Sequence, residues 1–251
     1  MVSSRSPREI ECMRLAGSVV AESLRLCRDT VRPGMTTEEL DAQVESLIRK
    51  RKGIPLFKGY RGYPKSICAS VNDEVVHGIP GSRVLQDGDL VSIDVGVRIG
   101  QYCGDAAATF PVGEVSEDAT RLMDICRTAL QRGIETLKPE MRLSTLSRAI
   151  QTYVELNGCS VVKKYTGHGI GREMHEEPQV PNFVVPSMTD MVLFEGVVLA
   201  IEPMVNAGRS EVDVLDNGWT VVTRDRSLSA HFEHTVAICE SGPEILTADV
   251  Q

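Results

Sequence analysis

The first thirty residues carry an apolar stripe with helical spacing. Its members recur at alternating steps of three and four: Ile10, Met13, Gly17, Val20, Leu24, Cys27 and Val31. This spacing predicts an amphipathic helix. Ser6 is the predicted N-cap, Pro7 fits the first turn and Glu9 completes a capping box, while Pro33-Gly34 ends the helix.

Similar patterns predict three more helices and several strands. A helix capped by Thr36, with Glu39 at the third position, buries Leu40, Val44, Leu47 and Ile48 and closes at Gly53. The stripes of the later two helices are Leu122, Ile125, Ala129, Leu130 and Leu137, ending at Pro139, and Leu143, Leu146, Ile150 and Val154, ending at Asn157-Gly158. Apolar runs predict strands over residues 90–97, 106–112, 198–201 and 235–239.

The second half of the chain repeats the plan of the first. Residues 31–35 (VRPGM) align with 137–141 (LKPEM), and residues 85–94 (LQDGDLVSID) with 193–202 (LFEGVVLAIE). In the longer match a glycine turn leads into an apolar strand that ends on a carboxylate, so Asp94 corresponds to Glu202. Asp105 and Glu233 each open a further strand and form a second predicted pair. We interpret this as an internal duplication, the alternative being chance similarity between ordinary helix and strand patterns.

This organisation predicts one domain over residues 1–251, with a pseudo-repeat of roughly 7–112 and 116–240. The fold class is α+β, with two helices per half backing a curved, mostly antiparallel sheet. If an approximate two-fold axis relates the halves, the paired acids converge near it.

Composition narrows the functional classes. The net charge of −8 argues against nucleic acid or an anionic membrane as the main partner. The seven cysteines include no Cys-x-x-Cys pair, which favours a reducing compartment over a disulfide framework or a thiolate zinc site. The N-terminus has no apolar core of a secretion signal, and the longest apolar runs are too short to span a bilayer. We therefore expect a cytoplasmic protein and, without a heptad seam, a monomer.

The candidate chemistry lies in the histidines and in four acids. All five histidines sit beside glycines or carboxylates: His77, His168, His175, His231 and His234. Asp94, Asp105, Glu202 and Glu233 would repel one another within a few ångströms, and two divalent cations would balance their charge. Oxygen ligands with one imidazole suit hard or borderline ions such as Mn, Fe(II) or Co. The pattern indicates a two-metal hydrolytic site.

The set Asp94, Asp105, His168, Glu202 and Glu233 resembles the five-ligand site of methionine aminopeptidases of the bacterial type I form. Several strings over residues 10–246 carry the resemblance: KSIC (65–68), NDEVVHGIP (72–80), GHGIG (167–171), HEEPQV (175–180), IEPM (201–204), DNGWT (216–220) and FEHT (232–235). It implies the pita-bread fold. It also implies that initiator methionine is removed before a small second residue, by a hydroxide between two metals.

The resemblance further implies a role for each site residue. Asp94, Asp105 and Glu233 would hold one metal, and Asp105, His168, Glu202 and Glu233 the other, with Co, Mn, Fe(II) or Zn as candidates. Glu202 would take and return a proton, while His77 and His175 would hydrogen-bond the substrate. A methionine pocket would be formed by Phe57, Tyr60, Tyr63, Cys68 and Trp219.

Two neighbours of His175 depart from the family pattern. Met174 stands where many relatives carry Phe and Glu173 where several carry Gly, which affects the pocket shape. We expect His231 and His234 either to support Glu233 from behind or to lie at the surface. Peptide and nascent-chain N-termini are the implied partners, with the ribosome as a further candidate.

Three other interpretations stay open. A proline-specific aminopeptidase or prolidase shares the fold and metals but normally has an additional N-terminal domain. A pita-bread binding module without metals would require loss of ligands, and all five positions are filled. Acids that serve only as surface charges would not explain why both halves place one after the same turn and strand.

Overall fold

The four predicted helices form in the computed structural model, which describes residues 2–248. They are α1 (Pro7–Thr30), α2 (Thr37–Lys50), α3 (Glu117–Glu135) and α4 (Leu143–Leu156). Both predicted capping boxes are present: Ser6 and Glu9 cap α1, and Thr36 and Glu39 cap α2, each pair satisfying backbone N–H groups of the first turn. The predicted helix starts are thus confirmed where the cap is local in sequence.

The strands pair only in antiparallel fashion within the described residues, as predicted. One sheet joins β1 (Ile54–Pro55), β4 (Leu90–Ile99), β2 (Cys68–Val71) and β5 (Tyr102–Pro111). Another has the order β15 (Gly242–Ile245), β14 (His234–Cys239), β9 (Val198–Ile201), β7 (Gly167–Gly169) and β8 (Glu176–Val180). Two three-stranded sheets complete the set: β13 (Ser229–His231), β10 (Met204–Asn206) and β6 (Ser160–Val161), and β11 (Val212–Val214), β12 (Val221–Thr223) and β3 (Glu74–Val76). A short 3₁₀ turn, η1, covers Tyr60–Gly62.

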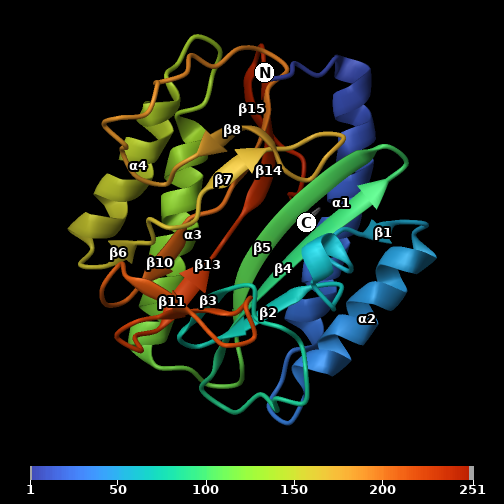
Figure 1. Ribbon diagram of the computed structural model, residues 1–251, viewed down its shortest axis with the longest axis vertical. Helices are drawn as coiled ribbons and strands as arrows, with labels where there is room; N and C mark the ends of the chain where they lie inside the picture. Colours follow the sequence, from blue (N-terminus) through green and yellow to red (C-terminus); the bar gives the residue numbers. More distant parts are fainter. Residues whose placement is uncertain (1, 249–251) are drawn as a thin grey trace.

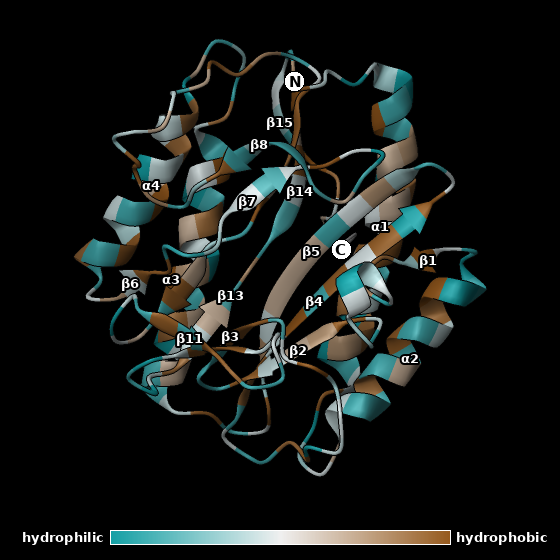
Figure 2. Cartoon of the chain, viewed as in Figure 1, coloured by the Kyte–Doolittle hydropathy of each residue, from teal (hydrophilic) through white to brown (hydrophobic). Residues whose placement is uncertain are grey.

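The helices flank the strands from two sides. Helices α1 and α2 lie on one side of the molecule and α3 and α4 on the other, with the strands between them (Figure 1). Helix α1 packs on β4 and β5, while α3 packs on α4, β10 and β13. Teal and brown segments alternate along the helices in Figure 2, as expected for helices with one buried face. None of the helices in the described part is both long and apolar enough to cross a membrane.

Each helix pair buries its own apolar core. Val20, Leu40 and Ile93 belong to the core under α1 and α2, and Leu130 and Leu199 to the core under α3 and α4. Helix α1 comes unusually close to β5, because a Cβ at Gly104 would lie 2.8 Å from the backbone nitrogen of Gly17. Only glycine permits this approach. The contact sets the position of β5 next to Asp105.

The same backbone hydrogen bonds recur in the two halves. In the first half the bonds run from Gly34 N to Leu85 O, from Leu85 N to Met35 O and from Gly88 N to Val112 O. In the second half the corresponding bonds, in the same order, run from Glu140 N to Leu193 O, from Leu193 N to Met141 O and from Gly196 N to Ile238 O. These correspondences support our proposal of an internal duplication within a single domain. The outermost residues of the predicted domain, 1 and 249–251, lie outside the described part of the chain.

Two details of the sequence-based interpretation are corrected. Asp94 does not end its strand, and Asp105 does not open one, because β4 and β5 form a long hairpin that contains both. The register also changes the second predicted pair. Asp94 lies opposite Ala107, and Glu202 follows Ile201, which pairs with His234, so Glu202 lies opposite Glu233. Glu233 therefore corresponds to Ala107.

The residue that corresponds to Asp105 follows from the same register. Asp105 lies two residues before Ala107, and His231 lies two residues before Glu233. The counterpart of Asp105 is therefore His231, and the predicted pairing of Asp105 with Glu233 is wrong. A carboxylate in the first half is matched by an imidazole in the second.

Candidate active site

Backbone contacts between the two halves bring Asp105 and Glu233 together. Glu233 N donates to Ala107 O at 2.9 Å, and Ala107 N donates to Glu233 O at 3.4 Å. Because Ala107 is in β5 and Glu233 directly precedes β14, this pair of bonds joins the first sheet to the second. Thr235 reinforces the junction through hydrogen bonds to the backbone of Asp105.

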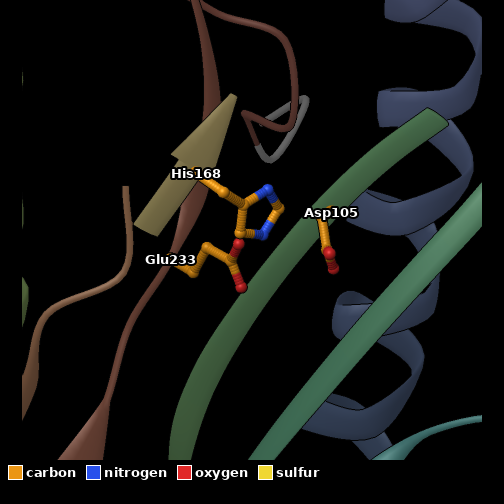
Figure 3. Close-up of side chains that lie close together, drawn as sticks. All are labelled: Asp105, His168 and Glu233. Carbon is orange, nitrogen blue, oxygen red and sulfur yellow. The ribbon is translucent and has the colours of Figure 1, made fainter. Parts of the chain in front are cut away.

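His168 completes a three-residue cluster at this junction. It lies on β7, and its imidazole points toward the carboxylates of Asp105 and Glu233 in Figure 3. One ligand atom of each residue lies within 4.8 Å of the other two. His168 Nδ1 is 2.9 Å from Gly169 O, and because a carbonyl can only accept, Nδ1 carries the proton. The lone pair of Nε2 is then free to bind a cation.

Asp94 and Glu202 complete the acidic set. Asp94 lies diagonally across the β4–β5 hairpin from Asp105, on the same face. Glu202 follows β9, and its Oε1 is 3.7 Å from His168 Nε2. The structure thus brings together all five residues that the sequence singled out as metal ligands.

The electrostatics of the four acids call for a cation. Burial, then neighbouring carboxylates, raises the pKa of Asp94, Glu202 and Glu233 well above the ordinary range, and burial raises that of Asp105 to about 7. Among the described residues, Asp94 Oδ1, Asp105 Oδ1 and Glu233 Oε1 are buried without a hydrogen-bond partner. Buried acceptors without donors are costly. Divalent cations would satisfy these oxygens and balance the charge, so the residues present fit a metal centre.

His77 and His175 face the same cavity. His77 follows β3 and holds a φ of 61°, a left-handed conformation that is strained for a residue with a side chain. Its ring meets Tyr165 edge-on at 5.5 Å and Trp219 at 6.2 Å between centroids. His175 Nδ1 is 3.0 Å from the Tyr60 hydroxyl, and burial lowers the pKa of both histidines.

A network at the N-terminus supports the loop that carries His175. The Arg5 guanidinium pairs with Glu176 Oε2, while Glu176 Oε1 accepts from the backbone nitrogens of Arg172 and Glu173 at 2.9 and 3.2 Å. Glu176 thereby connects the first residues of the chain to the loop just before His175. The sequence did not predict this network, because it depends on contacts between residues far apart in sequence.

The cavity has an apolar end beside the acids. It has a volume of about 360 Å³ and is lined by the predicted pocket residues Phe57, Tyr60, Tyr63, Cys68 and Trp219. Tyr63 and Trp219 meet edge-on at 5.0 Å, and Asn217 Oδ1 fixes Trp219 by accepting its backbone N–H at 3.0 Å. Met174, which stands where many relatives carry Phe, packs together with these pocket residues.

Some residues of the cavity were not predicted. Arg61, Val76, Tyr165 and Thr166 also line it. Tyr165 and Thr166 directly precede the Gly167-His168 motif, and Arg61 lies between Tyr60 and Tyr63, so proximity to the motifs was the available signal. His234 points elsewhere, with Nδ1 2.9 Å from the Thr247 hydroxyl. His231 is buried and faces Glu202, not Glu233.

Comparison with known proteins gives the same family over the length of the chain. Residues 11–240 match the model of metallopeptidase family M24. The chain is 50% identical over 247 residues to methionine aminopeptidase 1 of Bacillus subtilis, covering 98% of this chain and 99% of that protein.

Solved structures of known proteins resemble this chain to two different degrees. The chain is similar to a methionine aminopeptidase from Thermotoga maritima with a TM-score of 0.96 and 46% identity, covering 98% of this chain and 99% of the other. It also resembles a prolidase from Pyrococcus furiosus with a TM-score of 0.78 at 24% identity, covering 99% of this chain and 66% of the prolidase. The second likeness concerns the fold alone.

Proposed function

Because the chain belongs to metallopeptidase family M24, we propose that it removes the N-terminal methionine of peptides and nascent proteins with a small second residue. The observation that carries this proposal is an apolar cavity that ends on four acids and His168. Methionine is unbranched and its sulfur interacts favourably with aromatic rings, so it suits a pocket of Phe57, Tyr63 and Trp219. The adjacent acids then lie at the first peptide bond.

We propose that two divalent cations complete this centre. Asp94, Asp105 and Glu233 would hold one, and Asp105, His168, Glu202 and Glu233 the other. Such ions lower the pKa of a water molecule and polarise a peptide carbonyl. The all-oxygen and imidazole ligand set is compatible with Mn, Fe(II), Co or Zn.

The protein's own groups would move protons and bind the substrate. Glu202 is the proposed proton carrier because its carboxylate lines the cavity beside the proposed metals, with its side chain 15% exposed. When Tyr60 donates to His175 Nδ1, His175 Nε2 keeps its proton and can donate to the substrate carbonyl. Burial lowers the pKa of His77 to about 4, so it acts as a neutral imidazole with one N–H donor.

The small second residue would follow from crowding beyond the methionine pocket. His77, Tyr165 and Trp219 form consecutive edge-on ring contacts along the cavity wall. A long side chain on the second residue would have to displace these rings. In this proposal, the shape of the cavity wall restricts the second residue of the substrate to a small side chain.

Cleavage of three short peptides tests the activity. We would measure release of the first residue from Met-Ala-Ser, Met-Lys-Ser and Ala-Pro-Ser, anaerobically, with Mn, Co, Fe(II) or Zn. We expect cleavage of Met-Ala-Ser only. Cleavage of Ala-Pro-Ser alone would establish proline specificity, and no cleavage with any metal would reject the enzymatic proposal.

The cellular setting is part of the proposal. We propose a monomer acting in the cytoplasm on emerging nascent chains, with the ribosome as a partner and no direct nucleic-acid binding. The acidic net charge of −8 supports the last point. Seven cysteines without a Cys-x-x-Cys pair support a reducing compartment.

A further inference from the structure

Glu202 lies between two imidazoles. Its Oε1 is 3.7 Å from His168 Nε2, and its Oε2 is 3.7 Å from His231 Nε2. The two oxygens therefore face different rings. On the first side lies the proposed metal ligand His168, whereas no role has been assigned to the ring on the second side.

His231 is held rigidly and has an unused nitrogen. The residue is only 1% exposed, and its Nε2 has no hydrogen-bond partner among the described residues. Its backbone is fixed on both sides by one hydroxyl: His231 N donates to Thr109 Oγ1 at 2.9 Å, and Thr109 Oγ1 donates to His231 O at 3.0 Å. A buried imidazole nitrogen without a partner is costly unless it is satisfied during function.

The strand register gives His231 a specific place in the site. It is the counterpart of Asp105, a proposed bridging ligand, because the Thr109 hydroxyl bonds to the backbone N and O of His231 as the Thr235 hydroxyl bonds to those of Asp105. The first half thus supplies an oxygen to the metals at this position. The second half supplies a ring nitrogen, and that nitrogen faces a ligand oxygen.

We propose that His231 is a positioning residue for Glu202. Its Nε2–H donates to Oε2 of the ionised carboxylate and keeps Oε1 turned toward His168. At 3.7 Å the atoms are farther apart than a hydrogen bond, and a small movement of the Glu202 carboxylate closes the gap. This inference rests on the proposed function, because it assumes that Glu202 acts beside the metals. Partners behind a ligand typically change metal affinity or activity by about 10–100-fold.

Three substitutions at one position test the donor. His231→Gln keeps an N–H group at about the reach of Nε2, His231→Leu keeps the bulk without a donor, and His231→Asn keeps an amide that is one methylene shorter. His234→Gln is the matched control, because His234 bonds to Thr247 and not to an acid. We would measure kcat and KM on Met-Ala-Ser and, by calorimetry, the affinity for Mn²⁺.

We expect kcat of His231→Leu and His231→Asn to fall about 10–100-fold with little change in KM, and Mn²⁺ binding to weaken by about 10-fold. His231→Gln should stay within about threefold of wild type in both measurements. Wild-type kcat and affinity in His231→Leu would overturn the proposal. So would equal losses in the Gln and Leu variants, since that would indicate packing. If His231→Leu does not fold, the Gln and Asn variants make the same comparison.

The two readouts separate this inference from the proposed activity. Mn²⁺ binding can be measured even if no peptide is cleaved. A wild-type protein that fails to cleave Met-Ala-Ser yet loses Mn²⁺ affinity on His231→Leu would reject the activity and keep the positioning role. The reverse result, cleavage with an unaffected Leu variant, would reject only the positioning role.

Discussion

The hydroxyl of Thr235 holds the backbone of Asp105 on both sides. It accepts from Asp105 N at 2.9 Å and donates to Asp105 O at 2.7 Å, and both residues are buried. Thr235 comes from the second half of the chain and Asp105 from the first. One side chain thus fixes a proposed bridging ligand against the strand of the other half.

Thr235→Val should therefore weaken both folding and metal binding. The valine has nearly the same shape but leaves two buried backbone groups without partners, which costs about 1–3 kcal/mol per group. We expect a lower free energy of unfolding in urea and weaker Mn²⁺ binding by calorimetry. Thr235→Ser retains the hydroxyl and should stay close to wild type. A Val variant as stable as the Ser variant would contradict this role.

Glu202→Gln should abolish most of the activity while the fold survives. The amide cannot take a proton, and loss of a general acid–base group lowers turnover by about 10²–10⁴-fold. The measurement is kcat on Met-Ala-Ser at matched metal content, with the exposed Glu240→Gln as control. Near-normal turnover with metal bound would rule out Glu202 as proton carrier.

His77→Ala should damage turnover more than metal content. Losing one donor to the substrate at the reacting centre costs about 10²–10³-fold in kcat, whereas His77 is not a proposed metal ligand. His77→Asn is the companion variant, because Asn tolerates the left-handed φ of 61° better than Ala does. Loss of both metals in either variant, measured by elemental analysis, would show that His77 is itself a ligand.

Metal-free protein should lose stability as the pH rises through neutrality. Burial raises the pKa of Asp105 to about 7, and burial with neighbouring carboxylates raises those of Asp94, Glu202 and Glu233 well above their ordinary values. These acids ionise more readily in the unfolded chain, so their contribution to stability is complete below their ordinary pKa and is lost as the pH rises toward the raised pKa values.

A pH window isolates this effect. The buried histidines have lowered pKa values, and unfolded histidines lose most of their protons only by about pH 7.5, which by itself raises stability up to that pH. The trend from about pH 7.5 to 8 therefore reports the acids. We would record Tm with EDTA and with Mn²⁺. Mn²⁺ should raise Tm at every pH and flatten the decline, because it binds only the folded state. A Tm with EDTA that stays level or rises across the window would disagree with the proposed acid cluster.

Local features of the fold were predictable from sequence. The capping boxes at Ser6 and Thr36 and the stripes of α1 to α4 involve residues within a turn or two of one another. Their physical causes therefore lie in short segments of sequence. The position of Asp105 inside β5 was missed because Gly104 and the alanines that follow it resemble the start of a strand.

The roles of the two histidines beside Glu233 depend on geometry that no local pattern carries. Strand β13 ends at His231 and β14 begins at His234, so alternation cannot be followed across Phe232-Glu233. His231 consequently faces Glu202, which is close in space but distant in sequence. The five proposed ligands were found because their types and order match a family motif. Their convergence required the pairing of the two halves.

The junction between the halves also determines how the molecule comes apart. Asp94 and Asp105 belong to one half and His168, Glu202 and Glu233 to the other, so a cation held by these proposed ligands would be a cross-link between the halves. Opening either half would break the ligation, so the rate of metal release would report the rate of that opening. In hydrogen-exchange experiments, amides of α1 and α3 should differ in protection without metal and converge when metal joins the two halves into one cooperative unit.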